Sequence, residues 1–443
     1  MRGGLALFLA ALLTACGSQA PRVAEITPAF RSQSGESPVP VVLLPGVNRE
    51  VARVLRGGTL APFSVLELRT DSQALAALGD PRFPGGDAAA TALPAHLDKE
   101  LRGVAVRGLQ PLIDHLIRSQ GYVRGNPDQP FDKDYPENPA GLRADRSRAA
   151  SLFVLYHDWR RDVAENACVL GERIARIRAA TGADRVSLVG HSLGGVIARY
   201  YLRYGGRDVM GGRECPLGNP AARGPLNEPG ARRVAGAVFL GTPHRGTTQA
   251  FRALLEDFHL FGVIAVGLRD AVVTMPMAWE LLPFPDGRGS VPLLVGQDGV
   301  EHVALYTMRT WLERGWLDIG PGEASRAAFV EAMLARAASF QAHMTERNAA
   351  EDSVRRLTVG GECRPTLARA ILENGKLEFV GWGQSSQPLF DQATSPGDGI
   401  VSAQSALALP PSPTLAALAT CSRHSGYLED PSTLGRVTEF LIR

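Results

Sequence analysis

The 443-residue chain has the composition of an ordinary globular protein. Hydrophobic residues make up 45% of it and charged residues 21%, which excludes a disordered or collagen-like chain. The 47 basic side chains nearly balance the 45 acidic ones, giving a formal net charge of +2 without a basic run, so nothing indicates a nucleic-acid partner. The length allows two or three domains, or one large domain with insertions.

The N-terminus is typical of an export signal. A basic residue precedes an apolar stretch from Leu5 to Leu13, which is too short to span a bilayer. The following Leu13–Cys16, Leu-Thr-Ala-Cys, resembles the lipobox of bacterial lipoproteins, in which the cysteine is lipidated. We therefore expect a signal peptide over residues 1–15, acyl chains on Cys16, and a flexible tether over 16–38. The alternative is an ordinary secretory signal with an incidental cysteine.

These features predict an exported bacterial lipoprotein, anchored on the periplasmic face of a membrane or on the cell surface. In an oxidising compartment, the four remaining cysteines can form two disulfides with three possible pairings, which the sequence does not distinguish. These cysteines are Cys168, Cys215, Cys363 and Cys421. They show no Cys/His spacing of the zinc type, so no metal is expected.

From Val39 onward, apolar β-branched runs alternate with segments of helical periodicity. Strands are predicted at 39–45, 151–156, 184–189, 234–240 and 356–360. Helices are predicted at 109–117, 163–177, 196–202 and 434–442. This alternation predicts one α/β domain over residues 39–443, with a mostly parallel central sheet covered by helices on both faces.

The pattern changes between Gly246 and about Asp352, where helical segments are broken by turns. We interpret residues 246–352 as a helical cap inserted between two strands of the sheet. Its large apolar side chains are candidates for an acyl-chain pocket or lid, although such a stripe more often forms the core of its own region. They are Phe251, Leu254, Leu255, Phe258, Phe261, Trp279 and Trp311. Beyond residue 381, we expect mostly loops before the last helix.

The segment Gly190–Gly194, Gly-His-Ser-Leu-Gly, follows a predicted strand and opens a helix. This is the context of the nucleophile elbow of α/β-hydrolases. Glycines allow the sharp backbone turn and the close approach of a substrate, so Ser192 is the predicted nucleophile. The backbone N–H groups of Leu193 and of Val47, in the loop after the first strand, are the predicted oxyanion-hole donors.

A serine nucleophile needs a base oriented by a carboxylate, and in this chain order both follow the serine. His424, on a late loop beyond the last predicted strand, is the predicted base. The other histidines between Ser192 and that loop are His244, His259, His302 and His343. Asp391 and Asp398 both have suitable positions for the acid. The tight Gly-Asp-Gly turn, which can hold a carboxylate at a fixed angle, favours Asp398.

Several short motifs occur in a shared order along the chain. They are Leu43–Val47, Asp158–Arg160, Val189–Gly195, Gly241–Gly246, Leu281–Pro283, Gly397–Gly399 and His424. Together they resemble the lecithin:cholesterol acyltransferase family of α/β-hydrolases, which includes phospholipid:diacylglycerol acyltransferases and bacterial relatives. The resemblance implies a triad of Ser192, Asp398 and His424, with no metal or organic cofactor. The chain departs from the family at His157, where a tyrosine is usual, and at 400–402, where Ile-Val-Ser replaces Thr-Val-Pro.

The predicted function is serine-dependent acyl transfer on lipid esters by a membrane-tethered acyltransferase, lipase or phospholipase. Its partners would be a phospholipid or acylglycerol, water or an alcohol as acceptor, and the membrane that holds lipidated Cys16. One alternative is an esterase or thioesterase acting on soluble acyl substrates, because the fold does not determine the substrate. A second is a non-catalytic lipoprotein that binds lipid or assists folding, against which the retained triad argues.

Overall fold

The computed structural model describes residues 38–47, 108–125, 150–217, 225–256, 258–260, 264–266, 269–287, 289–317, 319, 323–380 and 389–443. The predicted signal peptide, the lipid anchor at Cys16 and nearly all of the predicted tether lie outside these ranges.

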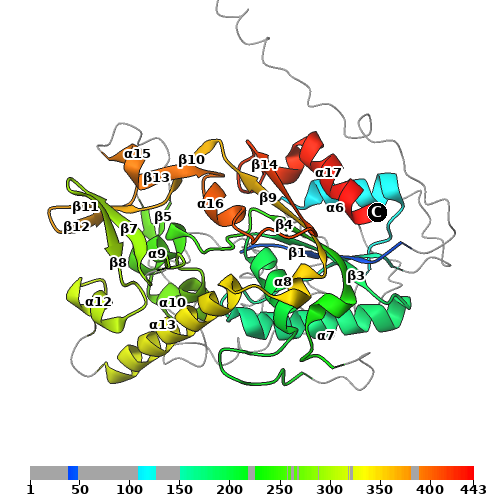
Figure 1. Cartoon of the computed structure of the whole chain (residues 1–443), viewed down its shortest axis with the longest axis horizontal. Helices are drawn as coiled ribbons and strands as arrows, with labels where there is room; N and C mark the ends of the chain where they lie inside the picture. The colour runs from blue at the N-terminus through cyan, green and yellow to red at the C-terminus, as the bar shows by residue number, and fades with distance from the viewer. Residues whose placement is uncertain are drawn as a thin grey trace, which may run out of the picture.

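A six-stranded sheet with the order β14-β9-β4-β3-β1-β2 forms the centre of the molecule (Figure 1). Every neighbouring pair in this sheet is parallel. Its strands are β1 Val41–Leu44, β2 Leu152–Val154, β3 Val186–His191, β4 Val234–Leu240, β9 Arg355–Gly361 and β14 Leu415–Thr420. The predicted α/β class with a mostly parallel central sheet is therefore confirmed.

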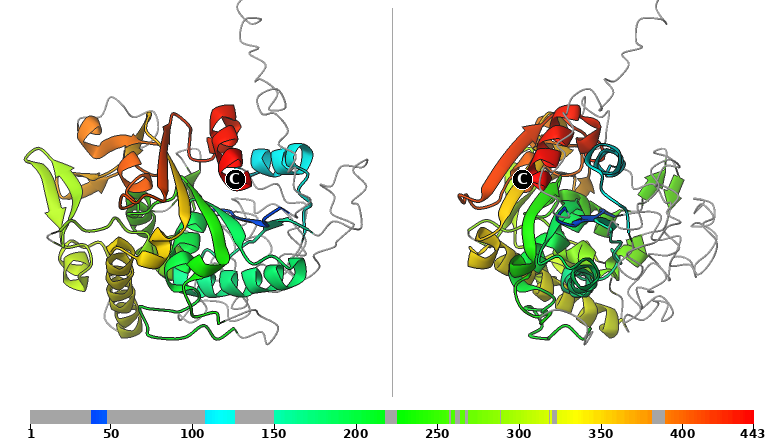
Figure 2. Two further views of the ribbon diagram at one scale, coloured as in Figure 1. Left: turned by 45° about the vertical axis from the view of Figure 1, so that its right-hand side comes forward. Right: turned by 90° about the vertical axis from the view of Figure 1, so that its right-hand side faces the viewer.

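Helices cover both faces of this sheet. Burial on both faces explains why the sequence of strand β1 is continuously apolar. Successive side chains of a strand point to opposite faces. Val41 and Leu43 pack with the helices α6 and α17 on one face, whereas Val42 and Leu44 pack with α7 and α8 on the other. These helices are α6 Gln110–Gln120, α7 Val163–Thr181, α8 Leu193–Tyr204 and α17 Pro431–Ile442. Figure 2 shows the same layers from two further directions.

Local capping signals define where these helices begin and end. Asp162 accepts a 2.7 Å hydrogen bond from the backbone N–H of Glu165 and so caps α7, which ends at Gly182 in the left-handed conformation. Asp430 caps α17 in the same way through Thr433, 2.8 Å away, and Pro431 begins the helix. These side chains satisfy backbone groups that a helix end leaves without partners.

The chain between β4 and β9 contains strands as well as helices. Its helices are α9 Thr248–Leu255, α10 Arg269–Val273, α11 Pro276–Glu280, α12 Met308–Glu313, α13 Ala324–Thr345 and α14 Ala349–Asp352. Its strands are β5 Phe258–Leu260, β6 Ile264–Val266, β7 Val291–Gly296 and β8 Gly299–Val303. The sequence pattern did not predict these strands, because they are short and their apolar residues follow no sustained alternation.

A second sheet with the order β12-β11-β7-β8 lies at the opposite end of the molecule from α6 and α17 (Figure 1). Its strands β11 Ala370–Glu373 and β12 Lys376–Glu378 come from beyond β9. Phe251, Trp279 and Trp311 are fully buried in the core of this region. Ring centroids lie 5.1 Å apart between Trp279 and Trp311. These aromatic residues therefore pack together as the region's own core.

Residues 389–443 form more regular structure than the predicted loops. They include α15 Phe390–Ala393, β13 Thr394–Gly397, α16 Ala403–Ala406, β14, the short 3-10 helix η4 Tyr427–Glu429 and α17, and β13 pairs with β10 Arg364–Leu367. Strand β14 is alanine-rich and lies at the sheet edge, with no residue buried, so it lacks the apolar run that predicts a strand.

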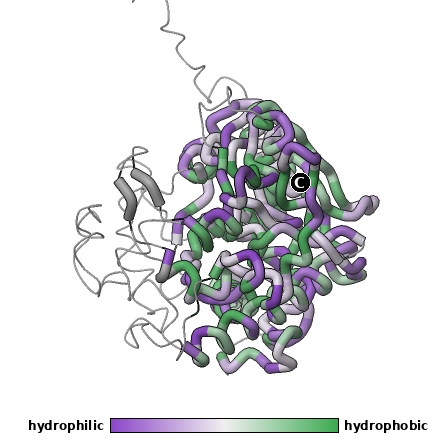
Figure 3. Tube along the Cα trace, turned by 90° about the vertical axis from the view of Figure 1, so that its left-hand side faces the viewer, coloured by the Kyte–Doolittle hydropathy of each residue, from purple (hydrophilic) through white to green (hydrophobic). Residues whose placement is uncertain are grey.

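None of the helices described is long and apolar enough to cross a bilayer. Hydrophobic and hydrophilic residues are interspersed along the trace (Figure 3).

An ion cluster whose three carboxylate residues are buried joins α13 to α7. The guanidinium of Arg336 on α13 lies 3.3 Å from Asp162, 3.1 Å from Asp208 and 3.3 Å from Glu280. Asp162 caps α7, and Glu280 of α11 accepts a 2.8 Å hydrogen bond from the N–H of Val163. We call these four charged residues the Arg336 cluster. It holds the segment between β4 and β9 against α7.

Candidate active site

Ser192 occupies a strained turn between β3 and α8. Its backbone has φ 54° and ψ −125°, in a region that L residues rarely adopt. Such a conformation costs about 1–3 kcal/mol and persists where the surrounding structure enforces it. The N–H of Ser192 donates to the carbonyl of Leu240, 2.9 Å away on β4. The turn therefore has the geometry of a nucleophile elbow.

The loop after β1 packs directly on this turn. A Cβ built on Gly46 would lie 2.8 Å from Cβ of Ser192, and a Cβ on Gly194 would overlap the carbonyl oxygens of Leu44 and Pro45. Only glycine allows this approach. In the strand order of the sheet, β2 lies on one side of β1, whereas β4 lies on the opposite side of β3. The loop after β1 is therefore at the topological switch point, where α/β sheets bind ligands.

The structure thus brings the two predicted oxyanion-hole residues to the same end of the sheet. Leu193 is buried as the first residue of α8, and Val47, with a side chain 57% exposed, follows Gly46. The donation by their N–H groups to an oxyanion stays a prediction.

Asp398 and His424 form a hydrogen-bonded pair at the same end of the sheet. Nδ1 of His424 lies 2.8 Å from Oδ2 of Asp398. The other carboxylate oxygen, Oδ1, accepts hydrogen bonds from the N–H groups of Ile400 at 2.9 Å and Val401 at 2.7 Å. Burial alone would raise the pKa of Asp398, but the hydrogen bonds and the nearby His424 hold it below its usual value. The carboxyl group is therefore ionised at neutral pH.

Tyr427 is a further residue at this pair, and the sequence analysis did not identify it. Its hydroxyl lies 2.6 Å from Oδ2 of Asp398 and accepts a 2.9 Å hydrogen bond from the N–H of Gly361. The backbone N–H of His424 also donates to the carbonyl of Asp398, 3.1 Å away. No spacing rule marks a tyrosine three residues after a base, so the residue becomes visible only in the fold.

The four cysteines form the pairs Cys168–Cys215 and Cys363–Cys421, which settles the choice that the sequence left open. The second disulfide links the end of β9 to the loop that carries His424. Gly361 packs on Asp398 just before this disulfide. The loop of the predicted base is therefore covalently attached to the strand beside the predicted acid.

His191, next to Ser192, contacts the predicted base His424. Its ring centroid lies 4.9 Å from that of His424, and Nε2 lies 2.7 Å from the carbonyl oxygen of His424. A carbonyl only accepts, so Nε2 of His191 carries the proton. Burial and the nearby His424 lower the pKa of His191 to about 4, so the ring is neutral at physiological pH.

The remaining candidates lie elsewhere. Asp391 is exposed on α15, and the hydrogen-bond partner of His424 is Asp398. His244 is buried, with Nε2 3.4 Å from the hydroxyl of Thr358, and burial lowers its pKa well below the usual value. His302 pairs with Asp286, 3.1 Å away. Across the residues that the structure describes, no His, Cys, Asp or Glu side chains gather as metal ligands.

The Asp158–Arg160 segment has a structural role. Asp158 and Arg160 are fully buried and form a two-point ion pair, with Nε–Oδ1 2.8 Å and Nη2–Oδ2 2.7 Å. The pair closes the turn that follows β2. Trp159 between them packs against the hydrophobic clusters on both faces of the main sheet and against that of the second sheet.

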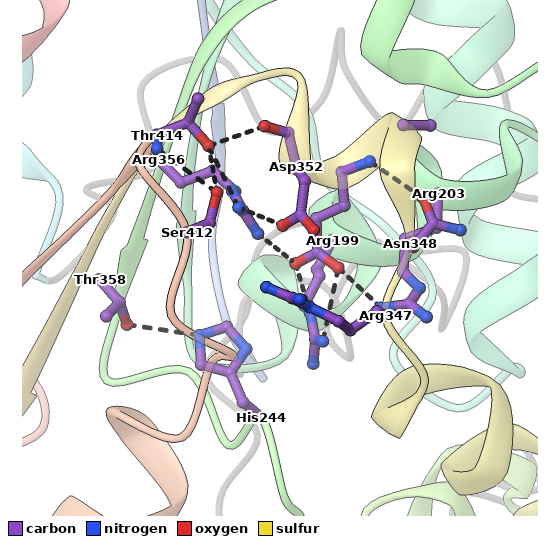
Figure 4. Close-up of polar contacts among 12 residues, drawn as sticks. Arg199, Arg203, His244, Arg347, Asn348, Asp352, Arg356, Thr358, Ser412 and Thr414 are labelled. Carbon is purple, nitrogen blue, oxygen red and sulfur yellow. Dashed lines mark hydrogen bonds and ion pairs between the residues drawn. The ribbon is translucent and has the colours of Figure 1, made fainter.

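A second buried ion cluster anchors α8, the helix that Ser192 begins. Glu351 on α14 lies 2.8 Å from Arg199, 2.7 Å from Arg203 and 3.0 Å from Arg356 of β9. Arg356 also contacts Asp352 at 2.7 Å. Figure 4 shows the three arginines converging beside Asp352. We call Glu351 and its three arginines the Glu351 cluster; it fixes α8 against α14 and β9.

Comparison with known proteins supports the fold. No protein-family model and no curated protein sequence matches the chain. The solved structure described as the Tle4-Tli4 complex matches with a TM-score of 0.51 and 15% identity, over 91% of this chain and 99% of that chain. The mature form of Bacillus licheniformis lipase BlEst2 matches with a TM-score of 0.39 and 13% identity, over 94% and 97%. The chain has the α/β-hydrolase fold, as its sheet order and nucleophile turn also indicate.

Proposed function

We propose that the protein is a serine-dependent acyl hydrolase or acyltransferase acting on lipid esters. The observation that carries this proposal is the Asp398–His424 hydrogen bond at the end of the sheet where Ser192 adopts its strained turn. A nucleophile, a base and an orienting acid in this chain order are the parts that acyl transfer requires. The motifs shared with the lecithin:cholesterol acyltransferase family favour a lipid ester as the substrate.

The reaction follows from the roles of these groups. Asp398 accepts from Nδ1–H of His424, which leaves the Nε2 lone pair as the base. Oγ of Ser192 attacks the ester carbonyl carbon and gives its proton to Nε2, while the amides of Leu193 and Val47 stabilise the oxyanion. Collapse breaks the ester C–O bond, and the departing alcohol takes the proton from His424.

The acyl group then leaves Ser192 by the reverse sequence. Water or an alcohol attacks the acyl-serine carbonyl, its proton passes to His424, and Ser192 leaves and recovers that proton. Water as acceptor gives a lipase or phospholipase, whereas an alcohol gives an acyltransferase. The outcome depends on how well the site excludes water.

Replacing the nucleophile tests the proposal directly. The chain without residues 1–16 is incubated with vesicles of labelled phosphatidylcholine and a fatty or sterol alcohol. Ser192→Ala should lower turnover at least about a thousandfold, because the covalent step is lost. New alcohol ester that disappears in the variant identifies an acyltransferase, and serine-dependent free fatty acid alone identifies a lipase or phospholipase.

A matched control is the serine-to-alanine change Ser187→Ala on β3, where the side chain is buried outside the candidate site. It should keep activity, and both variants should unfold cooperatively. Full activity in Ser192→Ala would overturn the proposal. Equal turnover of dispersed p-nitrophenyl butyrate and vesicle lipid would instead support the esterase alternative, and no labelling of Ser192 by a fluorophosphonate would support a non-catalytic lipoprotein.

We also propose that lipidated Cys16 holds the enzyme on a membrane. The support is the Leu13–Cys16 sequence after a short apolar stretch. The full chain, expressed in a bacterium fed labelled palmitate, should carry label and remain with membranes, whereas Cys16→Ser should lose both. Unlabelled wild-type protein released in soluble form would contradict the anchor and indicate an ordinary secretory signal.

A further inference from the structure

Tyr427 contacts the acid of the candidate triad at the oxygen that faces the base. Its hydroxyl and Nδ1 of His424 both lie within hydrogen-bond distance of Oδ2 of Asp398, at 2.6 and 2.8 Å. We propose that Tyr427 is a positioning residue that fixes this carboxylate and limits the negative charge that it offers to His424. The inference rests on the proposed function and adds a fourth side chain to it.

The directions of the hydrogen bonds follow from their partners. The N–H of Gly361 donates to the Tyr427 hydroxyl oxygen, 2.9 Å away. An N–H cannot accept, so the hydroxyl proton is free to point to Asp398, whose ionised carboxylate accepts it. The backbone N–H groups of Ile400 and Val401 occupy Oδ1. Oδ2 is therefore shared between the imidazole and the phenol.

The space around the pair suits a ring whose hydroxyl makes this contact. Gly241 has φ 54°, and a Cβ on it would lie 2.6 Å from Cε2 of Tyr427 and 3.0 Å from Oδ2 of Asp398. Tyr427 is 1% exposed, so the backbone and the ring together exclude solvent. Phenylalanine would fill the same volume and remove only the oxygen atom.

Sharing Oδ2 has a consequence for proton transfer. A hydrogen bond to a carboxylate stabilises its charge and weakens its hold on a second partner. Without the hydroxyl, more of that charge stabilises the imidazolium form of His424. The base then stays protonated to higher pH. The acid limb of the activity profile, which reports the free base, should therefore move upward.

Other ionisable groups near the pair are His191, Arg423 and Tyr427. His191 faces the pair from β3 and stays neutral, because burial and His424 lower its pKa to about 4. Arg423, next to His424 in the sequence, pairs with Glu429 at the surface, 2.9 Å away. Burial and the adjacent Asp398 raise the pKa of Tyr427 well above the physiological range, so its hydroxyl keeps its proton.

The test compares Tyr427→Phe with the parent chain on p-nitrophenyl butyrate between about pH 5 and 9. The acid limb of kcat/KM should rise by about half a pH unit or more, the size expected for one lost hydrogen bond to a buried charge. At the optimum, kcat should fall about tenfold with KM unchanged, because the pair is less well oriented.

Tyr200→Phe is the matched control. The buried Tyr200 hydroxyl also accepts a backbone N–H, from Val209 at 3.1 Å, and donates to a carbonyl, that of Arg207 at 2.8 Å. Tyr200→Phe should lose about as much thermal stability as Tyr427→Phe, but the acid limb of its kcat/KM profile should not shift. A Tyr427→Phe profile that superimposes on the parent, or an equal shift in Tyr200→Phe, would overturn the proposal.

A measurement without turnover separates this inference from the proposed function. In protein labelled with 15N-histidine, the ring signals that His424→Gln removes should titrate at higher pH in Tyr427→Phe than in the parent. If the parent cleaves no ester, the proposed function fails while this titration still decides the role of Tyr427. Identical titrations would refute that role even in an active enzyme.

Discussion

The Glu351 and Arg336 clusters are buried ion networks with opposite imbalances. Around Glu351, three arginines share one buried carboxylate, with Asp352 at the margin. Around Arg336, three buried carboxylates share one partly exposed arginine, and Arg213 also pairs with Asp208, 2.9 Å away. The first fixes α8, which begins at the candidate nucleophile, and the second joins α13 to α7. Both connect elements that are distant in sequence, yet they differ in their response to protons.

The sign of the imbalance determines that response. Burial alone would raise the pKa of Glu351, but Arg199, Arg203 and Arg356 lower it to about 2. Burial and the nearby Asp162 raise the pKa of Glu280 to about 8, although Arg336 opposes them. The Glu351 cluster therefore keeps its charges at any physiological pH. The Arg336 cluster binds a proton as the pH falls.

The largest expected effect is on the Glu351 cluster. Glu351→Gln would leave three buried arginines without their shared counter-charge, and breaking such a network costs about 3–5 kcal/mol of unfolding free energy. Urea unfolding at pH 8.5 or so would measure it. Activity should also fall, because α8 presents Ser192.

Glu280→Gln is the matched change in the Arg336 cluster. It removes a charge that the folded protein disfavours, so at the same pH it should cost about 1 kcal/mol or less. Equal losses in the two variants would show that the opposite charge imbalance has no energetic consequence.

The same imbalance should make stability depend on pH. The pKa of Glu280 is raised on folding from 4.5 to about 8, so its contribution is fully present below 4.5 and is lost as the pH rises through about 8. Unfolding free energy should therefore fall over that window by a few kcal/mol, at about 1.4 kcal/mol for each tenfold change in proton affinity. Glu351, with its pKa lowered from 4.5 to about 2, contributes constantly above 4.5.

Urea unfolding at several pH values between about 5 and 9 measures this slope, and Glu280→Gln should flatten it. A parent curve with the same slope as the variant would refute the assignment of the slope to Glu280.

Much of the central sheet was predictable because its strands are buried on both faces. Continuous short apolar runs such as Val41–Leu44 and Leu152–Val154, between turn signals, are typical of strands buried on both faces. Strand β14 escaped prediction because its alanine-rich residues lie exposed at the sheet edge. Strands β7 and β11 of the second sheet pair with each other although β9 lies between them in sequence, and local periodicity does not contain such a relation.

The candidate site likewise contains residues that the sequence predicts and residues that it does not. Ser192 was predictable because its turn requires glycines at set positions, and Asp398 and His424 followed from chain order and the family resemblance. Tyr427 and His191 reach the site through contacts between segments that are remote in sequence. Both charge clusters depend on residues that look like ordinary surface charges in a helix pattern. Their burial arises only when the elements pack.

The Cys363–Cys421 disulfide also shortens the loop that the hydrogen bond between Gly361 and Tyr427 closes. The hydrogen bond between Gly361 and Tyr427 spans 66 residues of chain. Through the disulfide, the same two residues are separated by two residues on one side and six on the other. Because loop-closure entropy grows with the logarithm of loop length, this shortening is worth about 2 kcal/mol. Once the disulfide has formed, the contact beside the acid closes only a short loop.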